Sequence, residues 1–301
     1  MDRLTIRKIK ETVSSRALWL LAGLVLVLFI GVLFVLVYKS SLALSTQSIV
    51  ELLFSSEWNP ERNSFGFLPA IAGTFYVTLI SLIIAIPTSI FSAIYIAEYS
   101  RGSLRAYLQS FIDVLAGIPS VVFGLCALLV LVPFVSDYLG PFLGVETTGM
   151  CVFTAGLVLA VMVFPIIISL SVESLRSLPV ELREVPLSLG ATKWETIKKV
   201  LLKAAGPGII SAILLGFGRA FGETMAVAMV IGGKNQIPLS IFSAGQTLPS
   251  LIVSSFGEMM SVPLEQSTLI FVALVLFFVV TVFNLLSRIV KARLKKRWKI
   301  K

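Results

Sequence analysis

The sequence predicts an all-α membrane protein with six transmembrane helices. Of its 301 residues, 57% are hydrophobic and only 14% are charged, whereas charged residues make up about a quarter of soluble domains. Six apolar segments are each close to the roughly 20 residues that a helix needs to cross the hydrocarbon core. The chain has no histidine, and its two cysteines, Cys126 and Cys151, lie inside apolar segments as packing residues. This composition excludes a disulfide framework and a cysteine–histidine metal site.

The predicted spans follow the apolar runs at residues 17–38, 70–97, 111–135, 150–172, 207–232 and 267–290. The first has the basic flank of a signal peptide, but its apolar run is longer than usual and no small-residue cleavage site follows it cleanly. We therefore expect a retained helix. Four prolines within the spans are expected to be tolerated, because neighbouring helices can bond the freed carbonyls. They are Pro87, Pro119, Pro133 and Pro165.

The positive charges predict the orientation in the membrane. With a cytoplasmic N-terminus, 21 of the 25 Lys and Arg residues fall in cytoplasmic segments, eight of them in the last 14 residues. The opposite loops hold only Lys39, Arg62 and Lys234, and Arg219 lies within a span. Cytoplasmic loops carry an excess of Lys and Arg, so both termini are expected in the cytoplasm. The basic tail then faces anionic lipid rather than nucleic acid.

This topology divides the chain into four parts. Residues 1–38 are the cytoplasmic N-terminus with the first helix, and residues 39–69 form an extracytoplasmic loop. Residues 70–290 form a core of five helices that includes a long cytoplasmic loop at 173–206. Residues 291–301 are the basic cytoplasmic tail.

The cytoplasmic loop at 173–206 is charged and has the start and stop signals of two short helices. Ser177 and Pro179 suit the opening of the first helix, and Gly190 suits its left-handed end. Thr192 precedes Glu195 by three residues, a capping box that predicts a second helix over 193–203. Two interpretations are open for this element. It is an amphipathic helix lying on anionic lipid, or it is a coupling element that inserts into a cleft on a cytosolic subunit.

The lipid-surface interpretation rests on the two faces of the predicted second helix. Ile197, Val200 and Leu201 share one face, and Lys198, Lys199 and Lys203 lie opposite. A helix with one apolar and one basic face suits a lipid surface, and it also suits a cleft on a partner protein.

The fifth span, GPGIISAILLGFGRAFGETMAVAMVIGG, carries two charges. Arg219 and Glu223 are four residues apart, so they are expected on one helical face near mid-span. Charges inside a membrane are costly and usually face a bundle interior or an aqueous path. The pair is therefore a structural ion pair between helices or part of a translocation path. Gly218 and Gly222 form a small-residue ridge that permits close helix approach at a subunit interface.

An arginine in a dry path is chemically suited to an oxyanion. Its planar fork donates two hydrogen bonds to phosphate-like oxygens. The carboxylate of Glu223 repels anions unless it accepts a proton from the substrate. Hydrogen phosphate carries such a proton at neutral pH and sulfate does not, so the pair of Arg219 and Glu223 favours phosphate.

No phosphate-binding loop of the G-x-x-x-x-G-K-[ST] type occurs in the sequence. The nearest string, Gly232-Gly233-Lys234, lacks the spacing and lies on the predicted outer side. Any ATP that drives this protein must be hydrolysed by a separate chain, which agrees with a docking role for the cytoplasmic loop.

The cytoplasmic loop resembles the "EAA" loop of ABC-importer permeases. The resemblance lies in Glu184–x5–Gly190, followed by Val200–x–Leu202, and in the flanking strings LPVELRE and LGATKWETIKKVLL. Val185-Pro186 stand where the family has two alanines, and Lys203 stands where it usually has proline, with Pro207 four residues late. The resemblance implies that this loop couples the chain to an ATPase. The coupling residues it implies are Glu184, Gly190, Ala191, Thr192, Trp194 and Glu195.

Three further strings resemble the phosphate-specific transport (Pst) permeases, and the PstC type in particular. They are WNPERNSFGFLPAIAGT (58–74), LAGIPSVVFGL (115–125) and GFGRAFGETMAV (216–227). The resemblance implies the type I ABC importer permease (MetI-like) fold, with five core helices and an added first helix. Arg219 and Glu223 match family positions implicated in transport.

The same resemblance implies a set of partners in a bacterial or archaeal cell membrane. These are a second, PstA-like permease subunit, two copies of a PstB-like cytosolic ATPase, and an extracytoplasmic PstS-like phosphate-binding protein, with membrane lipids around them. ATP and Mg²⁺ are then used by the partner ATPase, and this chain binds no cofactor. The outer loop at 233–266 is expected to be a gate, a helix that meets the binding protein, or a short helix packed on the outer rim.

Two alternatives remain open at this stage. The same architecture can carry another oxyanion, such as molybdate or sulfate. An ion-coupled secondary transporter that works alone predicts acidic residues in several spans. Here Arg219 and Glu223 are the strong intramembrane charges, with Asp113 near a membrane edge. An enzyme is the weakest interpretation, because no span or loop collects a nucleophile, a base and an orienting group.

Overall fold

The computed structural model describes residues 3–59 and 64–297, so Arg62, Lys299 and Lys301 of the charge count lie outside the described residues. Within these ranges, six helices are long and apolar enough to cross a membrane. The elements are α1 (Arg3–Thr46), α2 (Ile49–Phe54), β1 (Trp58–Asn59), β2 (Ser64–Phe65), α3 (Leu68–Ile94), η2 (Tyr95–Tyr99), α4 (Gly102–Gly117), α5 (Ser120–Cys126), η3 (Ala127–Leu131), α6 (Val132–Phe134), η4 (Val135–Leu139), α7 (Gly140–Phe142), α8 (Val152–Arg176), α9 (Glu181–Ser188), α10 (Lys193–Thr196), η5 (Ile197–Leu201), α11 (Leu202–Gly222), α12 (Met225–Val230), α13 (Leu248–Met259) and α14 (Pro263–Arg297).

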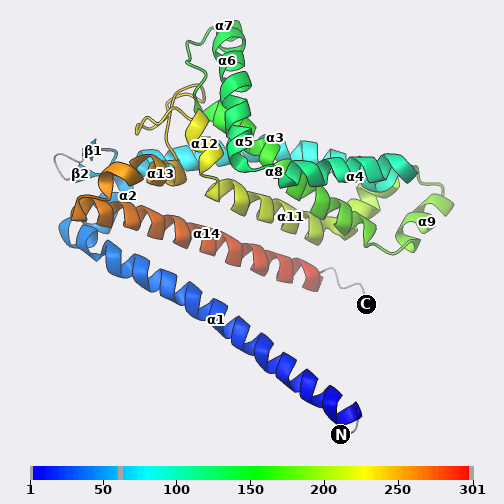
Figure 1. Ribbon diagram of the computed structural model, residues 1–301. Coiled ribbons are helices and arrows are strands. Elements are labelled where there is room, and N and C mark those ends of the chain that lie inside the picture. Colours follow the sequence, from blue (N-terminus) through cyan, green and yellow to red (C-terminus); the bar gives the residue numbers. More distant parts are fainter. Residues whose placement is uncertain (1–2, 60–63, 298–301) are drawn as a thin grey trace.

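The long helices form a lengthwise bundle. Helix α3 packs on α8, α8 on α11, and α11 on α14, while α1 contacts α14 and then diverges from the bundle (Figure 1). Small residues permit the close contacts in its centre. A Cβ on Gly156 of α8 would lie 2.6 Å from Ile80 of α3, and one on Gly216 of α11 would lie 2.8 Å from Ile167 of α8. The main core is built from buried residues of these three helices with η3, α6 and α12.

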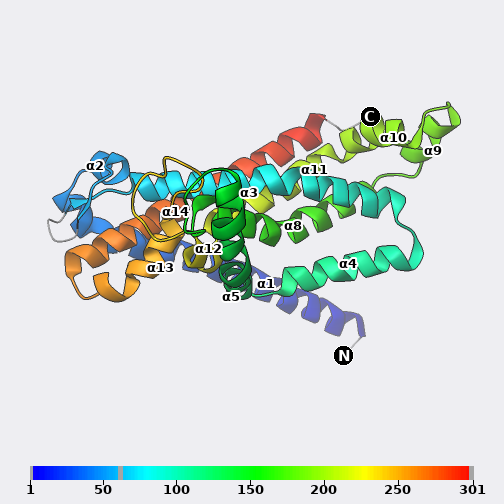
Figure 2. The same ribbon diagram turned by 90° about the horizontal axis from the view of Figure 1, so that it is seen from above.

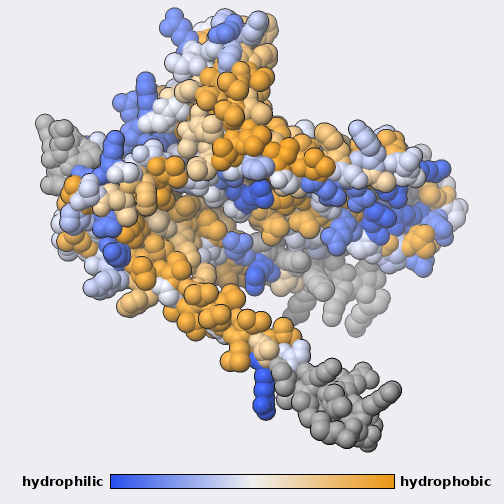
Figure 3. Space-filling view, in the orientation of Figure 1, coloured by the Kyte–Doolittle hydropathy of each residue, from blue (hydrophilic) through white to orange (hydrophobic). Residues whose placement is uncertain are grey.

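The bundle has two distinct ends. We call them the α9 end, which carries α9 and α10, and the α13 end, which carries α2, the β1–β2 hairpin and α13 (Figures 1 and 2). The described beginning of α1 and the described end of α14 both lie toward the α9 end. The surface over α1 is mainly hydrophobic, whereas hydrophilic residues gather at the α9 end (Figure 3).

The predicted third span, 111–135, is wrong as a single helix. Helix α4 ends at Gly117, and α5 begins at Ser120 after an extended Ile118 and Pro119. A proline disfavours the helical conformation of the residue before it and has no N–H to donate. Ile118 has a ψ of 128°, so the chain turns here instead of continuing. The path from α5 to α7 stands out across the bundle as an arm (Figure 1).

The other prolines of the predicted spans are accommodated. Pro87 lies inside α3 and Pro165 inside α8, and both helices continue past them. Pro133 lies in α6 directly after the widened turn η3, and the helical path continues past it. The first span is longer than expected, because α1 continues to Thr46.

The arm itself is built from π-helical turns as well as short α-helices. The turns η3 and η4 place a widened turn on each side of α6, and such turns often mark functional positions. Its outer face is apolar and exposed, with Leu129, Phe134 and Phe142 among the exposed residues.

Candidate functional site

The loop at the α9 end has the predicted glycine turn. Gly190 has a φ of 87°, a left-handed conformation that glycine adopts without steric cost. Its N–H donates to the Leu187 carbonyl at 3.0 Å, and the Ala191 N–H donates to the Pro186 carbonyl at 3.0 Å. This pair of bonds is a Schellman motif, which closes the end of α9. Pro186 lies within α9, so the departure from the two family alanines does not remove the helix.

The predicted capping box is also present. The Glu195 N–H donates to the Thr192 hydroxyl at 3.2 Å, and the Thr192 N–H donates to the Glu195 carboxylate at 3.0 Å. The helix that starts here is not a separate short helix over 193–203, as the sequence suggested. It runs from Lys193 through the π-helical turn η5 into α11 and ends at Gly222. The loop is therefore directly continuous with the fifth span.

The apolar face of this second helix packs inside the protein. Ile197 and Leu201 are buried with Ile94 at the end of α3 and Leu175 at the end of α8. Lys198 and Lys199 are exposed on the opposite face. An amphipathic helix on lipid needs its apolar face free, so the lipid-surface alternative is wrong for this element.

Apolar side chains remain exposed on α9, on the two turns that flank it and on α10. Leu189 is 83% exposed, although it stands in a polar part of the surface. We name this surface the docking patch and define it as Val180, Val185, Leu187, Leu189 and Trp194, all of which are exposed. Exposed apolar patches with polar surroundings mark interaction sites. Of the other predicted coupling residues, Glu184, Gly190 and Thr192 are exposed, and Ala191 and Glu195 are half-buried.

The geometry predicted for Arg219 and Glu223 is wrong. Helix α11 ends at Gly222, and Glu223 has extended backbone, with a ψ of 125°. A short helix, α12, then begins at Met225. Both side chains are described, Arg219 as exposed and Glu223 as half-buried, and no ion pair joins these two described residues. The structural ion pair is therefore not formed within the chain.

The break after Gly222 lies near the middle of the bundle's length (Figure 1). Irregular backbone at membrane depth is tolerated where it is buried in protein or lines a water-filled cavity. Glu223 stands in this break and Arg219 in the last turn before it. The position of the break suits an aqueous path better than a lipid-facing surface.

The glycine ridge of Gly218 and Gly222 is not used inside this chain. A Cβ on Gly218 would meet only Asn284 Oδ1 at 3.8 Å, and a Cβ on Gly222 would meet nothing within 4 Å. Gly216, which the sequence analysis did not single out, makes the close contact with α8. The ridge remains available for a contact with another subunit.

Asn284 is a site residue that the sequence analysis missed. It is exposed on α14, its Nδ2 donates to the Val280 carbonyl at 2.9 Å, and its Oδ1 is directed toward α11 beside Gly218. A stack of Phe217, Phe221 and Phe283 joins α11 to α14 at the same level. An amide within a transmembrane helix was the signal that could have drawn attention to it.

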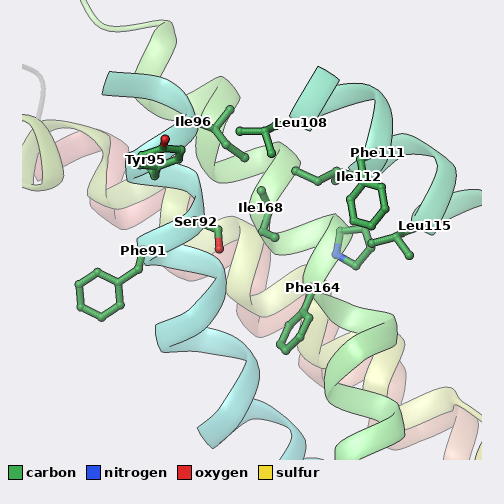
Figure 4. Close-up of a pocket in the computed structure, with 11 residues that line it drawn as sticks. Phe91, Ser92, Tyr95, Ile96, Leu108, Phe111, Ile112, Leu115, Phe164 and Ile168 are labelled. Carbon is green, nitrogen blue, oxygen red and sulfur yellow. The ribbon is translucent and has the colours of Figure 1, made fainter. Parts of the chain in front are cut away.

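A pocket of about 520 Å³ lies between α3, α4 and α8 (Figure 4). Phe91, Phe111, Phe164 and Ile168 are among its lining residues, and Ser92 and Tyr95 supply the polar atoms. Ser92 donates its hydroxyl proton to the Thr88 carbonyl. No lysine or arginine lines the pocket, so it does not have the donors that an oxyanion needs.

The outer loop at 233–266 contains a packed helix. Leu248 and Leu251 of α13 are buried against Phe67 and Phe271, and Thr247 caps α13 by accepting from the Ser250 N–H at 3.2 Å. The alternative of a short packed helix agrees with this arrangement. Val253 and Phe256 are exposed on its other face.

Comparison with known proteins places the chain in a family. Residues 85–299 match the family "Binding-protein-dependent transport system inner membrane component". The chain is 36% identical over 295 residues to the "Phosphate transport system permease protein PstC" of Xylella fastidiosa, covering 90% of each chain. It is 41% identical over 250 residues to the "Probable ABC transporter permease protein YqgH" of Bacillus subtilis, covering 82% of this chain and 79% of the relative.

Two solved structures share the fold. A bacterial alginate ABC transporter chain aligns with a TM-score of 0.64 at 17% identity, covering 94% of this chain and 97% of the other. A chain of the MetNI methionine ABC transporter aligns with a TM-score of 0.52 at 21% identity, covering 75% and 94%. The predicted fold of a type I ABC importer permease is thereby confirmed. This chain belongs to the family of inner membrane components of binding-protein-dependent transport systems.

Proposed function

We propose that this chain is a permease subunit of an ATP-driven importer of inorganic phosphate. It forms the translocation path with a second, PstA-like permease, and two copies of a PstB-like ATPase supply the energy from ATP and Mg²⁺. An extracytoplasmic, PstS-like binding protein delivers phosphate at the α13 end. The phosphate transport permeases among its relatives, at 36% identity over 90% of the chain, support this cargo.

The docking patch is the observation that carries the proposal. Its exposed apolar residues lie on α9, at both ends of that helix and in α10, and the Gly190 turn fixes the end of α9. A channel that works without partners would gain nothing from exposing apolar side chains to water on a charged loop of fixed conformation. An ATPase with a complementary cleft would bury the patch, in the way that an amphipathic helix fills a hydrophobic groove.

The α9 end is proposed to be cytoplasmic, in a bacterial or archaeal cell membrane. The described ends of α1 and α14 both lie toward this end (Figure 1), and the chain segments assigned to it carry most of the Lys and Arg residues. Cytoplasmic segments carry such an excess. This orientation places α9 where a cytosolic ATPase can reach it.

Arg219 and Glu223 are proposed to contact phosphate in the translocation path. Arg219 is exposed on the last turn of α11, and Glu223 stands in the break that follows. The arginine fork bonds phosphate oxygens in pairs. The carboxylate accepts a hydrogen bond from the proton of hydrogen phosphate, which sulfate does not carry. The second permease covers Gly218 and Gly222, which are open within this chain.

Replacing Leu189 tests the docking role directly. Leu189→Asp places a charge on the most exposed side chain of the patch, and co-purification of the ATPase with the chain is expected to be lost. Leu239→Asp is the matched control, because Leu239 is 97% exposed in the loop that precedes α13. Equal recovery of the ATPase with both variants would show that the patch is not the docking surface.

A further inference from the structure

A buried carboxylate at the end of α3 is held by the loop at 173–206, which carries the docking patch and which we call the docking loop. Glu98 lies in η2, and its side chain is only 7% exposed. Arg183 of α9 donates to it from two nitrogens, with Nη2 3.0 Å and Nε 3.2 Å from Oε1, and Nε 3.3 Å from Oε2. Charge-assisted bonds of this kind are about twice as strong as neutral ones. Glu98 and Arg183 are 85 residues apart in the sequence.

Arg183 also ties α9 to the end of α8. Its Nη1 donates to the Leu178 carbonyl at 3.0 Å, and its Nη2 donates to the Leu175 carbonyl at 2.7 Å. One guanidinium therefore joins the ends of α3 and α8 to α9, which we call the docking helix. A lysine at this position could not make these bonds together, because it lacks the planar fork.

Lys193 fixes the next turn of the loop to the same place. Its Nζ donates to the Glu98 carbonyl oxygen at 2.6 Å and lies 4.3 Å from the centre of the Tyr99 ring. We name Glu98, Arg183 and Lys193 the Glu98 clamp. Next to the Glu98 clamp in sequence, Ile94 of α3 and Ala97 of η2 form one buried apolar cluster with residues of η5. These are Ile197 and Leu201. The docking loop and the end of α3 thus form one packed block.

The other end of α3 is fastened to the segment that enters α13. The Leu248 N–H donates to the Thr74 hydroxyl at 2.8 Å. A Cβ on Gly73 would lie only 2.0 Å from the Gln246 carbonyl oxygen, so the two backbones touch directly. Gln246 and Thr247 are buried. Helix α3 therefore connects the α9 end to the α13 end (Figure 1).

We propose that Glu98 and Arg183 are positioning residues for energy coupling. They make the docking helix move together with α3, so that a displacement of α9 by the ATPase reaches the outer segment at 246–248. Helix α11 is continuous with the loop and moves the Arg219 region, while α3 carries the same displacement to the α13 end. This inference rests on the proposed function, because it assigns a coupling role within an ATP-driven importer.

The test is a double-mutant cycle on the clamp. The variants are Glu98→Gln, Arg183→Gln and both together, in the reconstituted complex of the chain with its second permease, ATPase and binding protein. The first readout is the number of ATP molecules hydrolysed per labelled phosphate imported. Each single variant is expected to raise this ratio by about tenfold, the size of one charge-assisted hydrogen bond. The ratio of ATP hydrolysed to phosphate imported in the double variant should not exceed the higher of the two single-variant ratios, because both substitutions remove the same contact.

The second readout is amide hydrogen exchange across α9 in the complex without ATP. It is expected to rise by about tenfold in the same variants. Lys199→Gln is the matched control, because the Lys199–Glu195 pair is in the same loop at 3.0 Å but is largely exposed and contributes little. Arg183→Lys keeps the charge and removes the planar fork, so both the exchange rate and the ATP-to-phosphate ratio should lie between those of the wild type and Arg183→Gln. This variant replaces Arg183→Gln in the test if the neutral variant does not fold.

The outcomes separate the two proposals. Faster exchange with an unchanged ATP-to-phosphate ratio would overturn the coupling role and leave the clamp as a structural contact. Unchanged exchange would overturn the clamp itself. A wild-type complex that hydrolyses ATP but imports no phosphate would refute the proposed cargo, while the exchange measurement would still decide whether the clamp holds α9.

Discussion

Arg219 is an exposed cation in the last helical turn before the break in the fifth span. It forms no ion pair with Glu223, and both residues are among those that the structure describes. An uncompensated charge at membrane depth is costly, so it requires water, a substrate or a partner subunit. The sequence placed Arg219 and Glu223 on one helical face, whereas the structure ends α11 between them. Gly222 is the last residue of α11, and the low helix propensity of glycine was a local signal that the helix could end there.

Replacing Arg219 is expected to abolish most phosphate uptake. Arg219→Ala removes both donors and should lower the uptake rate of labelled phosphate by about tenfold to a hundredfold, the range for losing hydrogen bonds to a charged group. Arg219→Lys keeps the charge but not the fork, and should retain a fraction of the activity. Uptake is measured in cells at matched expression of the chain. An uptake rate in Arg219→Ala equal to that of the wild type would show that Arg219 does not contact phosphate in the translocation path.

At the scale of elements, local signals were reliable where one residue decides the backbone. Gly190 and the Thr192–Glu195 box were predicted and are present. Pro119 breaks a predicted span, whereas Pro87 and Pro165 do not. The three prolines look alike in sequence, and the difference depends on how the neighbouring helices pack. The Glu98–Arg183 contact spans 85 residues, so no local pattern could have indicated it.

The turn at Gly190 gives a prediction about the docking helix. Open space surrounds this residue, so a substitution acts through backbone conformation and not through a clash. Gly190→Val should cost about 1–2 kcal/mol for the left-handed conformation and weaken binding of the ATPase by about tenfold. Gly190→Asn should be close to wild type, because asparagine tolerates this region. Binding of the purified ATPase to the detergent-solubilised chain provides the measurement. A similar loss of ATPase binding in both variants would show that the left-handed turn at Gly190 does not determine binding.

At the scale of the whole molecule, composition alone was enough to predict a helical membrane protein, and the structure and the family agree. The arm from α5 to α7 was not predictable. It has the length and apolarity of a transmembrane span, yet it stands across the bundle (Figure 1). Hydropathy reports which segments avoid water and gives no direction. The direction of the arm depends on contacts with α12 and α8.

The proposed orientation gives a prediction about access from each side. In a chain with Cys126→Ser, which removes the exposed native cysteine, single cysteines are introduced as Leu189→Cys and Leu239→Cys. A membrane-impermeant maleimide should label the Leu239 variant in intact cells or spheroplasts. It should label the Leu189 variant only after the membrane is opened. The reverse labelling pattern would show that the α9 end faces the outside of the cell and would contradict the proposed orientation.

The most direct test of the account is transport by the purified complex. The chain is reconstituted into proteoliposomes with its second permease, its ATPase and its binding protein, and accumulation of labelled phosphate is followed with and without ATP. We predict ATP-dependent accumulation that excess sulfate or molybdate does not reduce and that is lost when the ATPase is omitted. Accumulation of sulfate or molybdate in place of phosphate, or phosphate transport by the chain alone, would contradict it.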